Sequence, residues 1–100
     1  MKTTITNEQG KTTVTVEGRI DTLTSPEFLK ETEPLTTSEN PDITIDCKNL
    51  QYISSAGLRA LLILQKNVKV NNGTLILTNV IPAIKEIFKM TGFEKIFTIK

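Results

Sequence analysis

The sequence predicts an α/β fold, a mixed sheet of about four to five strands with about three to four helices packed mainly on one face. Stretches that alternate apolar and polar residues, typical of strands, are interleaved with stretches whose apolar residues recur at helical spacing. This alternation favours helices packed on a mixed sheet, with right-handed crossovers between parallel strands. The chain has 100 residues, so residues 1–100 are expected to form a single domain.

The first two strands are predicted to form a β-hairpin. Residues Thr12–Gly18 alternate apolar and polar side chains, and Thr3–Thr6 repeats the pattern more weakly. The two segments are separated by Asn7–Gly10, so a hairpin connection between them is the simplest interpretation.

A short helix is predicted to begin near Ser25. Thr24 and Ser25 offer a hydroxyl for the N-cap, and Pro26 suits the first helical turn. Pro34 is expected to end this helix, because it lacks an N–H donor and clashes with the preceding turn.

The middle of the chain is predicted to hold a strand followed by the central helix. Ile43 and Ile45 mark the strand, and Cys47 at its end is expected to be a partly buried small side chain. As the only cysteine, it has no partner for a disulfide or a zinc site. Residues Ala56–Val68 are apolar around much of the helix circumference, which predicts deep burial on one side of the sheet.

The C-terminal part is predicted to add a strand, a helix and a last strand. Residues Thr74–Leu77 are strand-like, and Pro82 opens a helix that Gly92 ends. The alternation within Phe93–Ile99 indicates a strand that pairs at the edge of the sheet. Exposed edge strands also leave weak self-association open.

The charge balance argues against nucleic acid as a direct partner. Lysine and arginine total 12 against 11 acidic residues, and the net charge of +1 creates no broad attractive field. The N-terminal segment lacks the apolar core of a signal peptide, and no stretch has the length needed to cross a bilayer. We therefore expect a cytoplasmic protein without membrane insertion.

The residue types needed for catalysis or metal binding are missing. The chain has no histidine, and Ser55–Gly57 does not fit the Gly-x-Ser-x-Gly pattern of hydrolases. Leu58 stands where a Ser-x-x-Lys pair would need its lysine. Scattered carboxylates such as Asp21 and Asp46 are poor metal ligands on their own. We predict no catalytic residue, no metal ligand and no bound cofactor.

Two serines, Ser54 and Ser55, lie where a buried strand gives way to the central helix. The N–H groups of a first helical turn have no intrahelical partner, and the peptide dipoles leave partial positive charge there, which favours an anion such as phosphate. One interpretation is a phosphoserine switch. The other is that one serine simply caps the helix, since serine is a favoured N-cap residue.

The segment Ile43–Leu58, together with Gly18–Asp21 upstream, resembles the STAS family, specifically the stand-alone anti-sigma factor antagonists of bacteria. The resemblance extends from about Ile5 to Ile99 and implies a STAS-like fold. In that family the signature loop is commonly Asp-Ser-Ser/Thr-Gly-Leu. Its first serine is phosphorylated by a partner kinase that doubles as the anti-sigma factor.

The resemblance assigns roles to the loop residues. Ser55 takes the phosphoacceptor position, Ser54 is implied to cap the helix, and Gly57 matches the pattern. Two positions depart from it, because Ser54 stands where an acidic residue is common and Ala56 stands where the family has serine or threonine. Asp21 matches an aspartate near the acceptor. The resemblance thus implies a partner-binding surface of Asp21, Ser54, Ser55, Ala56 and Gly57.

By resemblance, the unphosphorylated chain would bind an ATP-dependent serine-kinase anti-sigma factor and release the sigma factor. Phosphorylation of Ser55 would end the binding, and a separate serine phosphatase would restore it. The main alternative is a STAS docking subunit of a transporter ATPase or signalling assembly that is never phosphorylated. An enzymatic role ranks third.

Several residues keep a second interpretation. Asp21 is equally well explained as a turn or cap residue, and Gly57 as a small residue that allows close backbone approach. The basic residues of the central helix, Arg59, Lys66 and Lys69, form either a solvated face or part of a docking rim, with the solvated face favoured.

Overall fold

The computed structural model describes all 100 residues and confirms the predicted α/β fold. The elements are β1 (Lys2–Glu8), β2 (Lys11–Ile20), α1 (Ser25–Thr32), the 3₁₀ turn η1 (Glu33–Thr36), β3 (Asp42–Asp46), β4 (Leu50–Ile53), α2 (Ser55–Val70), β5 (Thr74–Thr78), α3 (Pro82–Thr91), the 3₁₀ turn η2 (Phe93–Lys95) and β6 (Thr98–Ile99). None of the helices is both long enough and apolar enough to cross a membrane.

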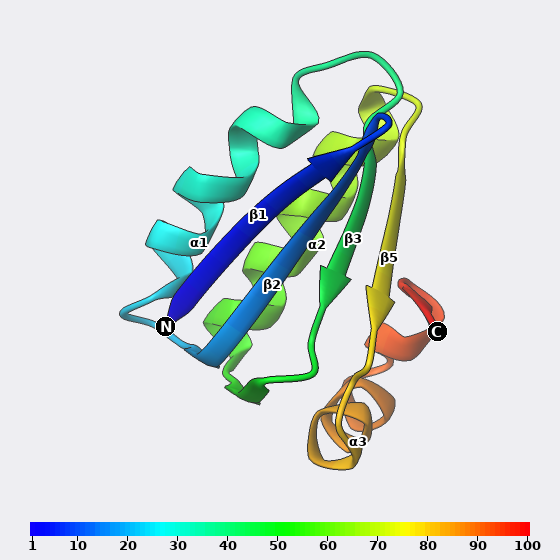
Figure 1. Cartoon of the computed structure of the whole chain (residues 1–100). Helices are drawn as coiled ribbons and strands as arrows, with labels where there is room; N and C mark the ends of the chain where they lie inside the picture. Colours follow the sequence, from blue (N-terminus) through cyan, green and yellow to red (C-terminus); the bar gives the residue numbers. More distant parts are fainter.

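The strands form one mixed sheet. Along its main path the order is β1-β2-β3-β5-β6, and β4 pairs with β2 off this path. Only β1 and β2 are antiparallel, whereas β2, β3, β5 and β6 run parallel to one another, as does the β2–β4 pair. Figure 1 shows β3 and β5 running in the same direction toward the end of the sheet where α3 lies.

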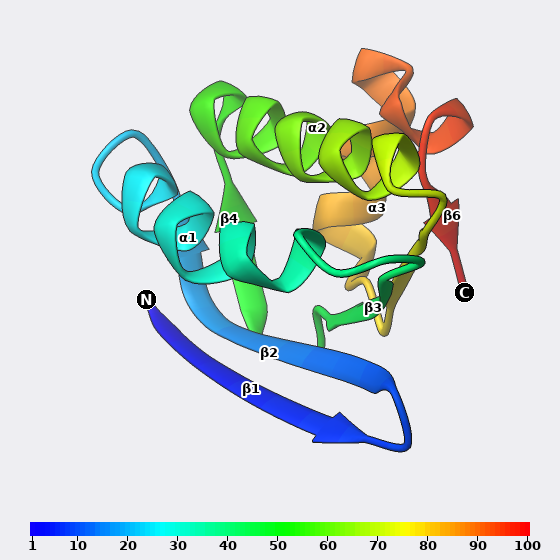
Figure 2. The same ribbon diagram turned by 90° about the horizontal axis from the view of Figure 1, so that it is seen from above.

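The helices are unequally distributed around the sheet. Viewed along the sheet in Figure 2, α1 and α2 lie together on one face, which agrees with the predicted packing on one face. Helix α3 lies instead beyond the ends of β3 and β5 and contacts β4. The end of the sheet near α3 is therefore built from elements that are far apart in the sequence.

A single apolar core joins these elements. It holds 20 buried residues, among them alternate side chains of β2 and β3. The helices contribute one face each, with Phe28 from α1, Leu61 and Leu64 from α2, and Phe88 from α3.

The N-terminal hairpin forms as predicted, with Glu8 paired to Lys11. The two residues between them, Gln9 and Gly10, have φ values of +52° and +81°. Positive φ at both positions is the requirement of a type I′ turn, which matches the natural twist of a hairpin. Gly10 adopts a positive φ without strain. Because a two-residue turn places Glu8 opposite Lys11, the turn also sets the register of the β1–β2 pair.

The sheet has six strands, where the sequence predicted about four to five. The strand that was missed is β4, which has only four residues. Its inner pair, Gln51 and Tyr52, is exposed, and its outer pair, Leu50 and Ile53, is buried. That pattern departs from the alternation by which a strand is recognised. The predicted last strand is also shorter, because Phe93–Lys95 turns as η2 before β6 begins.

The predicted helix boundaries are largely confirmed. Helix α1 begins at Ser25 and ends at Thr32, and Pro34 follows within η1. Helix α3 begins at Pro82 and ends at Thr91, and its C-cap residue Gly92 has a φ of +79°, the left-handed conformation common at helix C-termini.

Cys47 is more deeply buried than expected, with 1% of its surface exposed. Burial raises the pKa of its thiol from an ordinary value of 9.0 to about 12, and the neighbouring Asp46 carboxylate acts in the same direction. The side chain is thus a core residue and not a reactive thiol.

This burial predicts a pH-dependent loss of stability. Above about pH 9 the unfolded chain loses its thiol proton while the folded chain keeps it, so the free energy of unfolding falls as the pH rises toward about 12. We expect the urea midpoint to drop between about pH 8 and about pH 10.5, and to drop less in Cys47→Ala, which lacks the thiol. Equal drops in the two proteins would show that Cys47 contributes nothing.

Candidate functional site

The candidate site lies where β2 changes its neighbour in the sheet. The first half of β2, Lys11–Thr15, pairs with β3, and the last residues, Gly18–Ile20, pair with β4. The register shifts between Gly18 and Arg19, and Gly18 has a φ of +94°, which glycine adopts without strain. The N–H of Gly18 donates to the carbonyl of Asn49 at 2.9 Å, which fixes the entry into β4.

Ser54 joins β4 to α2 and caps the helix, as predicted. Its backbone N–H donates to the carbonyl of Ile20 at 2.9 Å. Its hydroxyl accepts the N–H of Gly57 at 3.2 Å, which satisfies one of the free donors of the first turn. Because this hydroxyl is occupied by the cap, Ser54 is a poor candidate for modification.

Gly57 allows α2 to approach β2 more closely than any other residue would. A β-carbon at this position would lie 2.5 Å from the carbonyl oxygen of Ile20 and 2.6 Å from Cγ1 of Ile53. Neither distance is possible without movement, so the expected close backbone approach is confirmed.

Ser55 is the first residue of α2 and is exposed to solvent, next to the half-buried Ala56. The first turn of α2 contains no acidic residue. The N–H groups of Ser55 and Ala56 have no intrahelical acceptor, so partial positive charge faces solvent beside an accessible hydroxyl. This geometry suits an anion attached to Ser55.

The turn between β2 and α1 borders the site and is organised by Asp21. One carboxylate oxygen, Oδ1, accepts the N–H of Leu23 at 3.0 Å and that of Thr24 at 3.1 Å. The N–H of Thr24 is the main cause that lowers the pKa of Asp21. The interpretation of Asp21 as a turn residue is confirmed, and its role in partner recognition stays a prediction.

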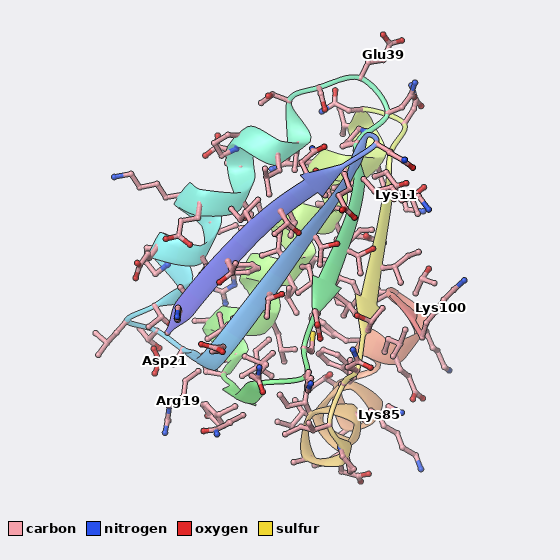
Figure 3. The ribbon with its side chains drawn as sticks, viewed as in Figure 1. Lys11, Arg19, Asp21, Glu39, Lys85 and Lys100 are labelled. Carbon is pink, nitrogen blue, oxygen red and sulfur yellow. The ribbon has the colours of Figure 1, made fainter.

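Arg19 completes this turn from the end of β2. Its Nε lies 3.6 Å from Oδ2 of Asp21, and its guanidinium carbon lies 4.6 Å from the centre of the Tyr52 ring. Figure 3 shows Arg19 and Asp21 at the same end of the sheet. The contact between Arg19 and Tyr52 was not predictable from the sequence pattern, because it depends on β4, which has no alternating pattern of its own.

The other predicted residues behave as expected of surface and core positions. Arg59, Lys66 and Lys69 are all exposed, and the Arg19–Asp21 contact is the only ion pair in the chain, which agrees with a solvated face. Leu58 is buried in the core.

No arrangement typical of catalysis or metal binding surrounds Ser55. No cluster of three potential metal-ligating side chains occurs anywhere in the structure. The largest hollow, of about 520 Å³, is lined by residues of α3, η2 and β6, and none of the three hollows is lined by Asp21, Ser54 or Ser55. The site is therefore an open surface rather than a pocket, as expected for contact with another protein.

Comparison with known proteins supports this fold. The family model described as "STAS domain" matches residues 2–100. BtrV of Bordetella bronchiseptica, provisionally named an anti-sigma factor antagonist, is 28% identical over 99 residues, which cover 99% of this chain and 85% of BtrV.

Solved structures share the fold at low sequence identity. The anti-sigma factor antagonist SpoIIAA in its unphosphorylated form matches with a TM-score of 0.74 and 13% identity, over 99% of this chain and 87% of SpoIIAA. Its phosphorylated form from Bacillus has the same TM-score at 14% identity, over 99% and 91%. A sulfate transporter family protein from Wolinella succinogenes also scores 0.74, at 18% identity over 88% of this chain and 71% of its own.

The cap geometry predicts different effects of the same substitution at two adjacent serines. Ser54→Ala removes the acceptor of the Gly57 N–H and should destabilise the protein by about 1 kcal/mol. Ser55→Ala removes only an exposed hydroxyl and should change stability by less than about 0.5 kcal/mol. Urea unfolding of both variants measures the difference. A larger loss for Ser55→Ala would contradict the assigned cap.

Gly57→Ala should also be destabilising, although alanine is ordinarily the better helix former. The new methyl group would collide with the carbonyl of Ile20 and with Ile53, so we expect a loss of about 1–3 kcal/mol. Thermal unfolding of this variant, with Ser55→Ala as the matched control in the same turn, tests the close approach. Stabilisation by Gly57→Ala would refute it.

Proposed function

The chain belongs to the STAS domain family, and on that basis we propose that it acts as an anti-sigma factor antagonist controlled by phosphorylation of Ser55. The unphosphorylated form binds a serine-kinase anti-sigma factor and thereby releases the sigma factor. Transfer of phosphate to Ser55 by that kinase ends the binding, and a serine phosphatase restores it.

The observation that carries this proposal is that the two adjacent serines have different roles in the structure. The Ser54 hydroxyl is occupied by the helix cap, whereas Ser55 is exposed at the positive end of α2. With alanine at position 56, Ser55 is the single free hydroxyl at this helix end. Its accessibility is what a partner kinase requires of its substrate.

A phosphate on Ser55 is compatible with the folded state. It adds about −1.5 to −2 charges, which the helix dipole and the free N–H groups of the first turn stabilise. SpoIIAA matches this fold equally well with and without its phosphate, so in that protein phosphorylation leaves the fold in place. The charge acts instead on the partner surface, through desolvation and repulsion.

In this scheme the chain is a substrate and a competitor. The kinase supplies ATP and the catalytic groups, so the chain itself needs no cofactor and no catalytic residue. Asp21, Ser54, Ser55 and Ala56 form the surface that the kinase contacts, whereas Gly57, predicted to belong to it, is buried against β2 and instead sets the position of the helix end. The exchange takes place in the cytoplasm, where sigma factors and RNA polymerase are found.

A second candidate function is docking to a transporter or a signalling assembly without phosphorylation. The fold shared with a sulfate transporter family protein favours it, as does the non-acidic residue Ser54 at a position where the family often has an acid. The two functions differ in whether Ser55 receives phosphate.

Incubation with the cognate anti-sigma factor kinase and ATP distinguishes the two. We expect intact-mass spectrometry to show one phosphate on the wild type and on the loop control Ser38→Ala, and none on Ser55→Ala, which should still bind the kinase. Ser55→Glu should weaken binding, within the limits of a carboxylate as a phosphate substitute. Binding of the wild type without phosphate transfer would favour the docking function.

A further inference from the structure

The most exposed large apolar side chain of the protein lies beside the candidate site. Leu23, at the tip of the turn between β2 and α1, is 88% exposed. Tyr52 of β4 is 41% exposed at the same end of the sheet. A single exposed leucine is ordinary on a protein surface, so its significance depends on how it is held.

The turn that carries Leu23 is unusually well fixed. Asp21 Oδ1 accepts the N–H groups of both Leu23 and Thr24. The Thr24 hydroxyl accepts the N–H of Asp21 at 2.8 Å and lies 2.9 Å from the carbonyl of Arg19, to which it donates. These hydrogen bonds involve only the backbone of Leu23, so the fold does not require a leucine side chain at this position. The turn presents an apolar group in a preorganised position.

Arg19 is held beside the turn in a similar way. Arg19 and Tyr52 are register partners on adjacent parallel strands, so their side chains share one face. The guanidinium lies near both the Tyr52 ring and the Asp21 carboxylate, yet the Arg19 side chain remains 63% exposed. Its Nε faces Asp21, and the remaining N–H donors are free to meet an acceptor on a partner.

We infer that Leu23 and the Arg19–Tyr52 pair form a second anchor of the docking surface, which fits a shallow apolar pocket flanked by a carboxylate on the partner. The occupant is the serine-kinase anti-sigma factor, so this inference rests on the proposed function. Aromatic, arginine and buried apolar anchors carry most of the free energy of binding at protein interfaces. The hydrogen-bonded turn reduces the entropy that is lost on binding.

The anchor and the acceptor serine lie at the same end of the sheet. The backbone N–H of Ser54 donates to the carbonyl of Ile20, the residue after Arg19, which places the start of α2 beside the end of β2. Phosphate on Ser55 then adds a dianion at this end of the sheet, where it repels acidic groups of the partner.

A matched control is available at the opposite end of α2. Val70 is 79% exposed, and it is separated from Ser55 by roughly 22 Å of helix. Leu23→Ala and Val70→Ala each remove an exposed aliphatic group that makes no core contact. Neither should change the thermal unfolding midpoint, so an effect on binding can be assigned to the docking surface.

The test is titration calorimetry of the full chain against the purified cognate anti-sigma factor kinase loaded with ADP. We expect Leu23→Ala and Arg19→Ala to weaken binding at least about tenfold, and Val70→Ala to change it less than about twofold. Equal affinities of Leu23→Ala and Val70→Ala would overturn the inference. A loss of affinity in Leu23→Ala that is accompanied by a lower thermal unfolding midpoint would also overturn the inference.

Failure of the proposed function looks different. If the kinase binds the wild type but transfers no phosphate to Ser55, the switch is refuted while the anchor is still judged by the affinities of the variants. If the kinase does not bind the wild type at all, both the function and the anchor are refuted. A Ser55 that is phosphorylated with an unchanged KM in Leu23→Ala refutes the anchor alone.

Discussion

The site depends on one constraint, the change of partner that β2 undergoes at Gly18. Up to Thr15 the strand pairs with β3, and from Gly18 it pairs with β4, with a register shift next to Gly18, whose φ is positive. This change creates a second, short strand that leads directly into α2. The carbonyl of Ile20 then receives the N–H of Ser54, and Gly57 packs against the same carbonyl. The position of Ser55 follows from these contacts because it is one of the two residues between Ser54 and Gly57.

The same constraint accounts for what the sequence could and could not predict. The hairpin, α1 and α3 were predictable because their ends carry local signals, such as Gly10, Pro82 and Gly92, whose backbone preferences act without tertiary context. That one of the two serines caps α2 was predictable for the same reason, whereas the choice of Ser54 came from the resemblance to the STAS family. Strand β4 was not, because it exists through pairing with a segment some 30 residues earlier and has no alternating pattern of its own. Missing β4 concealed the Arg19–Tyr52 contact, which forms only when the two strands pair.

The electrostatics of the site are local and nearly balanced before modification. Arg19 and Asp21 offset each other, the first turn of α2 has no acidic residue, and the chain as a whole carries a net charge of +1. A phosphate on Ser55 would therefore be the dominant charge of this surface, whereas on a strongly acidic surface it would be a small addition. The absence of an acid at position 54 lowers the negative charge of the unmodified state and so enlarges the relative change.

The rigidity of the site determines where such a charge can act. Ser54, Gly57 and Asp21 are each tied to β2 or its turn by backbone hydrogen bonds or close packing, and Gly57 lies so near the Ile20 carbonyl that a β-carbon would not fit. A fixed helix end gives a phosphate no bistable element to displace within the chain. The effect of the phosphate must therefore appear at the surface, as a difference in binding free energy between a partner that contacts the Ser55 hydroxyl and one that contacts a phosphate dianion. The proposed anchor at Leu23 is consistent with this arrangement, because it would supply affinity that does not depend on the charge of Ser55, while the proposed phosphate on Ser55 would change the part that does.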